Sequence, residues 1–162
     1  MVLNKTILIL EDNLKILSRI LDNLFELEQN QPFELSVIVL TNSQQVEDYV
    51  NTNPRSQFDI ILLDRDCKLN KSFHILDIEK IGADKIIAIS SVPEYNQEAK
   101  QRGVKKVVLK DMRNIDSFAK EVTKEVEKMI TPSRLIKLFN RNLSVAEVTN
   151  AVTTQLKAPK QH

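Results

Sequence analysis

Short apolar runs alternate with longer amphipathic segments along most of the chain. Five runs are typical of β-strands, and they cover residues 6–10, 34–41, 58–64, 85–89 and 104–109. In the clearest of them, four apolar residues from Ile60 to Leu63 follow one another and stop at Asp64. An uninterrupted apolar run indicates a strand that is buried on both faces, as in the middle of a parallel sheet.

Helical spacing of apolar residues separates these runs. Leu17, Ile20 and Leu24 lie on one face of a helix predicted over residues 14–27, and Asn13 is its expected N-cap. Further helices are predicted over residues 43–50, with Ser43 as the cap, and over residues 73–81, 93–102 and 114–130. The polar segment 65–72 is expected to be an exposed loop. The helix at 93–102 has almost no apolar residues, so we expect it to be short and loosely held.

Strand and helix therefore alternate five times. This order predicts an α/β fold, with a doubly wound five-stranded parallel sheet and helices on both faces. The repeat occupies residues 1–130 as one domain, which leaves residues 131–162 as a C-terminal extension.

The extension carries signals for two short helices. Thr131-Pro132 is a good helix start, and Ser144 with Glu147 forms a capping box. Five basic residues against one acidic residue give the segment a net charge of +4. We expect it either to pad the surface of the domain or to form a homodimer or partner contact. It is too short for an appended helix-turn-helix domain, so nucleic acid is not the favoured partner.

Composition narrows the range of functions. The net charge of +1 indicates neither a membrane nor nucleic acid as a partner, and no apolar run is long enough to span a bilayer. Cys67 is the only cysteine, so no internal disulfide forms, which suits a reducing, cytoplasmic setting. The two glycines, Gly82 and Gly103, are too few for a glycine-rich nucleotide-binding loop.

Polar side chains follow four of the five predicted strands: Glu11 and Asp12, Asp64, Ser90, and Lys110. The carboxyl ends of parallel strands lie at one edge of a sheet, which is where open α/β sheets bind ligands. We therefore expect these side chains to converge.

Three carboxylates at one edge repel one another unless a cation lies among them. Mg²⁺ is the natural choice, since it is a hard ion that prefers oxygen ligands. Lys110 adds a second positive charge, and the Ser90 hydroxyl can donate to an oxyanion. With Asp64 as a carboxylate nucleophile, the set predicts a site for a phosphoryl group.

Four segments, Ile7–Asn13, Ile60–Asp64, Ile86–Ser91 and Val107–Lys110, resemble the receiver domain of two-component response regulators. The resemblance spans residues 5–130 in the order and spacing of that family. It implies a flavodoxin-like fold and a signalling switch rather than a turnover enzyme. By this resemblance, Asp64 would accept a phosphoryl group from the phosphohistidine of a sensor histidine kinase or a histidine phosphotransfer protein.

The resemblance also implies roles for the other residues at the strand ends. Ser90 would move toward the phosphoryl group, and Lys110 would pair with it. Mg²⁺ would be held by oxygen ligands from Glu11, Asp12, Asp64 and the backbone carbonyl of Asp66.

The chain departs from the pattern of the family at several positions. Asp111 replaces the proline that usually follows the lysine and favours a cis bond that aims it; a cis bond before a residue other than proline costs about 3 kcal/mol. Val107 stands where the family often has an aromatic switch residue. Cys67 and Lys68 replace a usual Met-Pro, and no glycine follows. A degenerate receiver, which binds a partner without being phosphorylated, therefore stays open as an alternative.

A phosphatase is the second alternative. Asp64-Arg65-Asp66 after an apolar strand also resembles the haloacid dehalogenase superfamily, where the first aspartate is the nucleophile and the second a general acid. Those enzymes begin with this strand, whereas two predicted strands precede it here. They also usually carry an acidic pair late in the chain and a larger cap.

Several candidates also have a purely structural interpretation. Glu11 and Asp12 carry the charge that a helix N-terminus favours, and Lys110 lies close to other surface lysines. Of the two serines, Ser91 rather than Ser90 is expected to cap the next helix.

Three residues near the predicted site have no clear chemical role in the sequence. We expect Cys67 to be a loop thiol and His74 to lie at the surface or at the start of a helix. For Arg65, an influence on access to the site is no better supported by the sequence than a simple solvated position.

Overall fold

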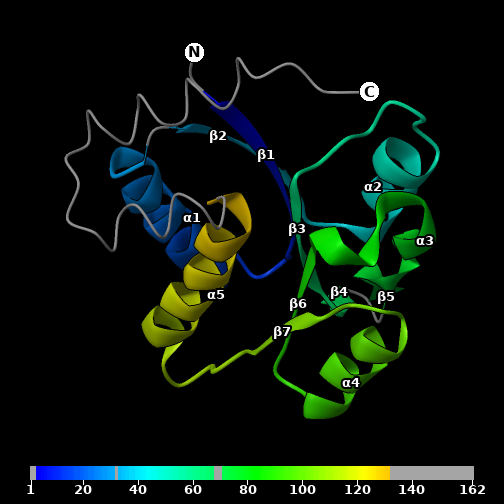
Figure 1. Cartoon of the computed structure of the whole chain (residues 1–162). Helices are drawn as coiled ribbons and strands as arrows, with labels where there is room; N and C mark the ends of the chain where they lie inside the picture. The colour runs from blue at the N-terminus through cyan, green and yellow to red at the C-terminus, as the bar shows by residue number, and fades with distance from the viewer. Residues whose placement is uncertain (1–2, 32, 68–70, 132–162) are drawn as a thin grey trace.

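The computed structural model describes residues 3–31, 33–67 and 71–131, which form a parallel sheet between two layers of helices (Figure 1). Its five strands are β1 (Leu3–Leu10), β2 (Phe33–Leu40), β3 (Ile60–Asp64), β6 (Ile86–Ser90) and β7 (Lys106–Leu109). They lie in the order β2-β1-β3-β6-β7, and every pairing in this sheet is parallel. The predicted fold class is confirmed. The predicted helical extension covers residues 131–162, and all of it except Thr131 lies outside the described residues. Thr131 is the C-cap residue of the preceding helix, Ile115–Ile130.

Two helices cover one face of the sheet, α1 (Leu14–Gln29) and α5 (Ile115–Ile130) (Figure 1). The other face carries α2 (Ser43–Val46), α3 (Ile78–Ile81) and α4 (Pro93–Gln101). A π-helical turn, Glu47–Asn51, continues α2, and short 3₁₀ turns cover Phe73–Ile75 and Ala83–Lys85. None of the helices in the described part of the chain is long and apolar enough to cross a bilayer.

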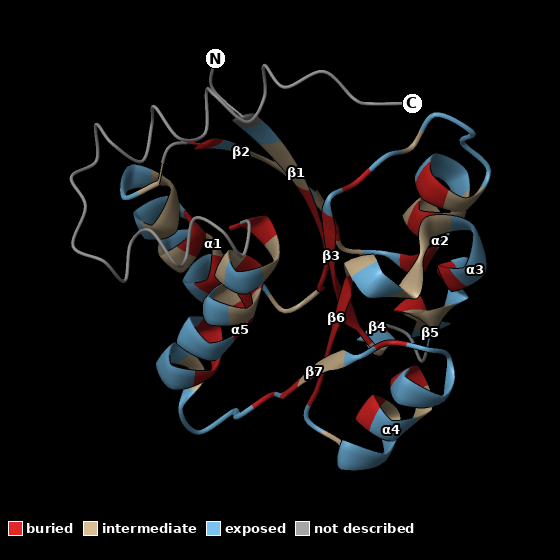
Figure 2. Ribbon diagram, viewed as in Figure 1, coloured by how far each residue is buried: buried red, intermediate tan, exposed pale blue. Residues whose placement is uncertain are grey.

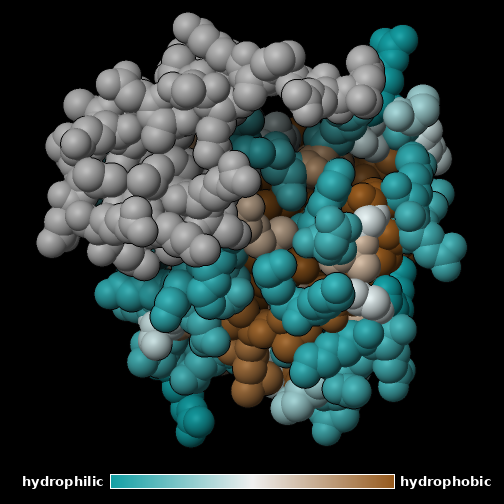
Figure 3. Space-filling view, viewed as in Figure 1, coloured by the Kyte–Doolittle hydropathy of each residue, from teal (hydrophilic) through white to brown (hydrophobic). Residues whose placement is uncertain are grey.

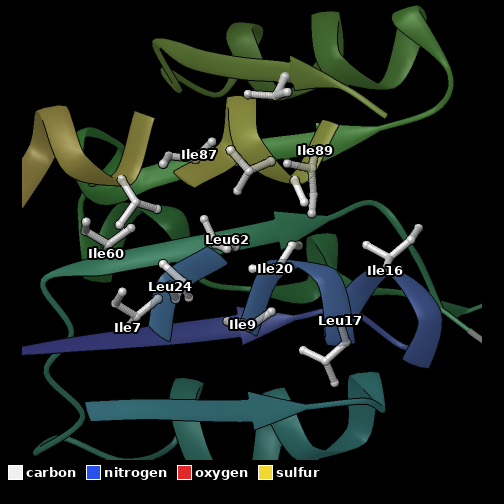
Figure 4. Packing of buried hydrophobic residues seen from close by; sticks show 14 of the residues in the cluster. Ile7, Ile9, Ile16, Leu17, Ile20, Leu24, Ile60, Leu62, Ile87 and Ile89 are labelled. Atoms are coloured by element: carbon white, nitrogen blue, oxygen red, sulfur yellow. The ribbon is translucent and has the colours of Figure 1, made fainter. Parts of the chain in front are cut away.

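The two faces of the sheet form separate hydrophobic clusters. Alternate residues of each central strand point to opposite sides. Ile60 and Leu62 pack toward α1 and α5 in the first cluster, while Ile61 and Leu63 pack toward α2 and α3 in the second cluster. The central strands β3 and β6 are buried along their whole length, whereas the edge strands β2 and β7 are only partly buried (Figure 2). Figure 4 shows α1 packed on the sheet through its apolar stripe, with these residues labelled on helix and strands: Ile16, Leu17, Ile20, Leu24, Ile7, Ile9, Ile60 and Leu62.

The surface follows the same division. On the face seen in Figure 3, hydrophilic side chains cover the two helical layers, and hydrophobic side chains gather in a band between them. The helices α1 and α5 therefore turn mainly apolar side chains toward the sheet and mainly polar side chains toward the solvent.

Local predictions near the helix starts are confirmed in one case and wrong in another. The side chain of Asn13 accepts hydrogen bonds from the backbone amides of Lys15 and Ile16, so it caps α1 as predicted. Asn42, not Ser43, caps α2, and Ser43 is buried instead. Both residues can cap a helix, and the sequence does not show which of the two side chains faces the core and is therefore unable to cap.

The segment after β3 is not simply an exposed loop. Asp66–Cys67 (β4) pairs in antiparallel fashion with Lys71–Ser72 (β5), and Cys67 is buried against the second cluster. The thiol of Cys67 lies 3.7 Å from the carbonyl oxygen of Thr41. The prediction of a solvated loop was wrong here because two short stretches of this segment pair with each other, and the first of them buries the side chain of Cys67.

The helix α4 has little apolar contact with the rest of the fold, as its sequence predicted. Asn96 and Ala99 are the residues of this helix that are buried. The Asn96 side-chain amide donates to the carbonyl of Val108 at 3.3 Å, so part of the attachment of α4 to the sheet is polar.

The order of the strands determines where a ligand can bind. Chain connections leave β1 and β3 in opposite directions across the sheet, and this change of direction opens a crevice at their carboxyl ends. Leu10 pairs with Leu63 in the register, so both strands end at the same level. The acidic residues that follow β1 and end β3 therefore lie side by side.

We predict that Leu62→Ala lowers the free energy of unfolding by roughly 2–5 kcal/mol. Leu62 is fully buried between Ile9 and Ile87 of the neighbouring strands, so truncation leaves a cavity in the most constrained part of the sheet. Urea titration measures the loss. Ile38→Ala is the control, because Ile38 is 45% exposed on β2, and its loss should stay below about 1 kcal/mol. Equal losses for the two variants would contradict the prediction.

Candidate functional site

A pocket of about 310 Å³ opens at the carboxyl edge of the sheet. Its lining includes all six residues that the sequence singled out: Glu11, Asp12, Asp64, Asp66, Ser90 and Lys110. Five of them lie at the ends of β1, β3, β6 and β7, as predicted from strand order, and Asp66 lies in β4 (Asp66–Cys67). The lining also includes Met112 and Cys67, which the sequence did not indicate as part of a site.

Lys110 is the centre of the charged network in this pocket. Its ammonium lies 2.7 Å from Oδ2 of Asp64 and 2.8 Å from Oε2 of Glu11, and all three side chains are buried. Burial alone lowers the pKa of Lys110, but the two carboxylates outweigh it and raise that pKa, so the side chain stays charged. The interpretation of Lys110 as a surface lysine is wrong.

Asp64 ends β3 and is 6% exposed. Its Oδ1 accepts a hydrogen bond of 2.8 Å from the backbone amide of Arg65. Burial is the main cause that raises the pKa of Asp64 to about 6, and the charge of Glu11 adds to it, while Lys110 opposes both. A carboxylate in this position is a stronger base than an exposed aspartate, which suits a nucleophile held in place by a cation.

Glu11 is fully buried, and both of its oxygens have partners. Oε1 accepts the backbone amide of Asn13 at 2.9 Å, and Oε2 accepts Lys110. The first contact closes the turn between β1 and α1, so Glu11 links the start of α1 to the charged network. An exposed residue that only favours the helix dipole would make neither contact.

Glu11, Asp12 and Asp64 can hold a metal ion together. Each offers one carboxylate oxygen, and these oxygens lie within 4.8 Å of one another. A carboxylate has about four lone-pair positions, so oxygens that already accept one hydrogen bond retain capacity for an ion. This donor set fits a hard divalent cation.

Asp66 lies apart from the three clustered carboxylates. Its side chain is exposed, and Oδ1 accepts a hydrogen bond of 3.1 Å from Arg65. The expectation from the sequence concerned its backbone carbonyl, which stays a prediction.

Ser90 is buried at the end of β6, and its backbone carbonyl accepts the amide of Lys110 at 2.8 Å. Its hydroxyl oxygen accepts the backbone amide of Val92 at 3.1 Å, just before α4. The N-cap residue of α4 is Val92, and no side chain among the described residues caps this helix, so the cap that we expected of Ser91 is wrong. The contact to Val92 still leaves the Ser90 hydroxyl able to donate, because a hydroxyl can accept one hydrogen bond and donate another.

Asp111 and Val107, the two departures from the receiver pattern near Lys110, have different structural consequences. No peptide bond among the described residues is cis, yet Lys110 reaches both carboxylates. Val107 packs against the second cluster, and no ring is available at that position. The lysine is thus well aimed without proline, while the aromatic switch position is filled by an aliphatic side chain.

A second charged group, which sequence reasoning missed, lies between β3 and α4. Arg65 contacts Glu98 and stacks on Tyr95. His74 lies in the first turn of the 3₁₀ segment Phe73–Ile75 with its side chain only 8% exposed, so of the two positions that we expected it has the helix start and not the surface. The sequence placed these residues in separate segments, and only the polar composition of α4 hinted that charged partners would hold it.

Comparison with known proteins gives a likeness in structure alone. No protein-family model matches the chain, and no curated protein sequence matches it. Sixteen solved structures do match. The phosphorylated cyanobacterial phytochrome response regulator RcpA aligns with a TM-score of 0.60 and 18% sequence identity, over 79% of this chain and 95% of that one.

Two further structures are similar over the same region. The Mn²⁺-bound form of response regulator Rcp1 has a TM-score of 0.58 and 13% identity, over 73% of this chain and 91% of its own. A response regulator receiver domain from Rhodospirillum rubrum has a TM-score of 0.54 and 16% identity, over 72% and 89%. The chain therefore has the fold of response regulator receiver domains.

We predict that Lys110→Met lowers the free energy of unfolding by roughly 3–5 kcal/mol in metal-free buffer near pH 7. The change leaves Glu11 and Asp64 buried without their cation. The loss should shrink as the pH falls, because the pKa of Asp64 lies at about 6 even with Lys110 present and rises without it. Because the native pKa of Asp64 is raised above its usual value, the penalty is fully present above the native pKa and declines as the pH falls from there toward the usual pKa of an aspartate.

Urea titration at several pH values measures this effect. Lys105→Met is the matched control, since Lys105 is exposed on the same segment and its loss should be small at every pH. Adding Glu11→Gln to Lys110→Met should recover part of the stability by removing one buried charge. A loss that grows toward acid pH would contradict the assignment.

Proposed function

We propose that this chain is a response regulator receiver, in which phosphorylation of Asp64 acts as a conformational signal. The observation that carries the proposal is the buried network of Lys110 with Asp64 and Glu11, beside Asp12, at the carboxyl edge of a receiver-type fold. The phosphodonor would be a sensor histidine kinase or a histidine phosphotransfer protein. A reducing cytoplasm suits the single thiol of Cys67.

The proposed reaction transfers a phosphoryl group between two side chains. A carboxylate oxygen of Asp64 attacks the phosphorus of the donor's phosphohistidine, a phosphorus–oxygen bond forms, and the phosphorus–nitrogen bond breaks. The electron pair of the broken bond leaves with the imidazole, which then takes up a proton. Lys110 is placed to neutralise the oxygens of the phosphoryl group, since its ammonium already contacts Asp64.

A divalent cation fits beside this reaction centre, and we propose that it is Mg²⁺. Glu11, Asp12 and Asp64 would hold it, with the backbone carbonyl of Asp66 as a further ligand. When bound, the ion supplies positive charge for the phosphoryl oxygens. Ser90 would donate its hydroxyl to one of those oxygens while it keeps its contact to Val92.

The phosphatase alternative has less support. Asp66, its proposed general acid, is exposed and paired with Arg65. The nucleophile strand is also the third in the chain rather than the first. A degenerate receiver has less support too, because Asp64, Lys110 and Glu11 remain together in the pocket.

Incubation with acetyl phosphate and Mg²⁺ should add one phosphoryl group to the chain, seen by intact-mass spectrometry. The adduct should be absent for Asp64→Asn and after EDTA treatment, because both the nucleophile and the cation are needed. Asp66→Asn is the matched control and should still form the adduct, since only its backbone carbonyl is assigned a role.

Two outcomes would contradict this proposal. Sustained hydrolysis of a generic phosphate ester, abolished by Asp66→Asn, would favour the phosphatase. Absence of both the adduct and Mg²⁺ binding would favour the degenerate receiver.

Binding of Mg²⁺ should weaken as the pH falls through the pKa of Asp64, which is about 6 in the metal-free protein. Protons and the ion compete for the same carboxylate, so the apparent affinity should fall by up to about tenfold per pH unit below about pH 6 and level off above it. Isothermal titration calorimetry measures this dependence. Asp64→Asn should bind more weakly and lose this pH dependence. A pH-independent affinity in the unchanged chain would rule out Asp64 as a ligand.

A further inference from the structure

The helix α4 is attached to the rest of the fold mainly through polar contacts. Asn96 and Ala99 are its buried residues, so apolar packing contributes little. On the side toward β3, the guanidinium of Arg65 lies 4.2 Å from the ring centre of Tyr95, and its Nε lies 3.5 Å from Oε2 of Glu98. One arginine from outside the helix thus engages two of its side chains.

The same arginine is the residue that follows the phosphoacceptor. Its backbone amide donates to Oδ1 of Asp64 at 2.8 Å. Its carbonyl accepts the hydroxyl of Ser72 at 2.7 Å and the amide of Phe73 at 3.0 Å. The backbone of Arg65 is therefore held at the site by three hydrogen bonds, while its side chain reaches α4 and also donates to Oδ1 of Asp66.

The contacts around Glu98 are loose enough to be exchanged. The Nε of Arg65 and the Nδ1 of His74 are both buried without a hydrogen-bond partner, and each lies 3.5 Å from a Glu98 oxygen. Burial, the main cause, lowers the pKa of His74 and so favours its neutral form. Of these two side chains, Arg65 is therefore the one that carries a positive charge next to Glu98.

We propose that Arg65 couples the charge at Asp64 to the position of α4. This inference rests on the proposed function. A phosphoryl group at Asp64 adds negative charge next to the backbone of Arg65, and a guanidinium is the side chain best suited to pair with phosphoryl oxygens. As the guanidinium turns toward the site, Glu98 and Tyr95 lose their partner, and α4 loosens. Arg65 and Tyr95 then connect the site to α4. The aliphatic Val107, at the position where receiver domains often have an aromatic switch residue, has no ring to do so.

Hydrogen exchange followed by mass spectrometry tests the coupling in the full chain. With acetyl phosphate and Mg²⁺, the amides of Pro93–Gln101 should exchange about fivefold faster than without them, as expected for losing one exposed ion pair and one cation–π contact. In Arg65→Gln, α4 should exchange rapidly from the start, and phosphorylation should change it by less than about twofold. Intact mass measured on the same samples gives the yield of the adduct.

Three variants separate coupling from simple loosening. Glu98→Gln removes the ion pair from the helix side and should reduce the response as Arg65→Gln does. Glu94→Gln changes the same charge at an exposed position of α4 and should respond like the unchanged chain. Arg102→Gln removes the hydrogen bonds from Arg102 to the carbonyls of His74 and Leu76, so it should loosen α4 yet keep the response.

The outcomes distinguish this inference from the proposed function. A normal adduct yield with a full α4 response in both Arg65→Gln and Glu98→Gln would overturn the coupling alone. A normal yield with no change of α4 exchange in the unchanged chain would also overturn the coupling alone. Absence of the adduct from the unchanged chain would overturn the proposed function and the coupling with it.

Discussion

The contact of Lys110 with Asp64 and Glu11 is the interaction on which the site depends. Two carboxylates cannot remain charged and buried beside each other without a cation, and the ammonium lies within 2.8 Å of both. The same contact ties the ends of β1, β3 and β7 together. A network that balances charge in this way is sensitive to any added charge, which is why we propose that the pocket responds to a phosphoryl group or a metal ion.

The sheet supplies the rigidity that this network requires. The strands that end at the pocket are packed on both faces, and β1 and β3 stay in register up to their last residues. Charged side chains at their ends therefore have little freedom to move apart. Rigid positions for the carboxylates and a movable partner nearby are what a switch needs, because a change of charge must be relieved somewhere other than in the core.

The helix α4 is the element best suited to move. It has few apolar contacts, and its attachments come from Arg65, Asn96 and Arg102. Polar contacts of this kind respond to charge, whereas apolar packing does not. The aliphatic Val107 and the stacking of Arg65 on Tyr95 are the observations behind our proposal that Arg65 couples the site to α4.

The sequence by itself determined the alternation of strands and helices, and with it the fold class. Because parallel strands end at one edge, it also determined that Glu11, Asp12, Asp64, Ser90 and Lys110 would meet. Periodicity and strand order are local or topological properties, and for this reason they can be read without coordinates. The cap of α2, the hairpin over Cys67 and the burial of His74 depended on which side chains found space against the core. The pairing of Arg65 with Glu98 was decided by the tertiary structure alone, since it joins residues from separate elements that only the packed fold brings within contact distance.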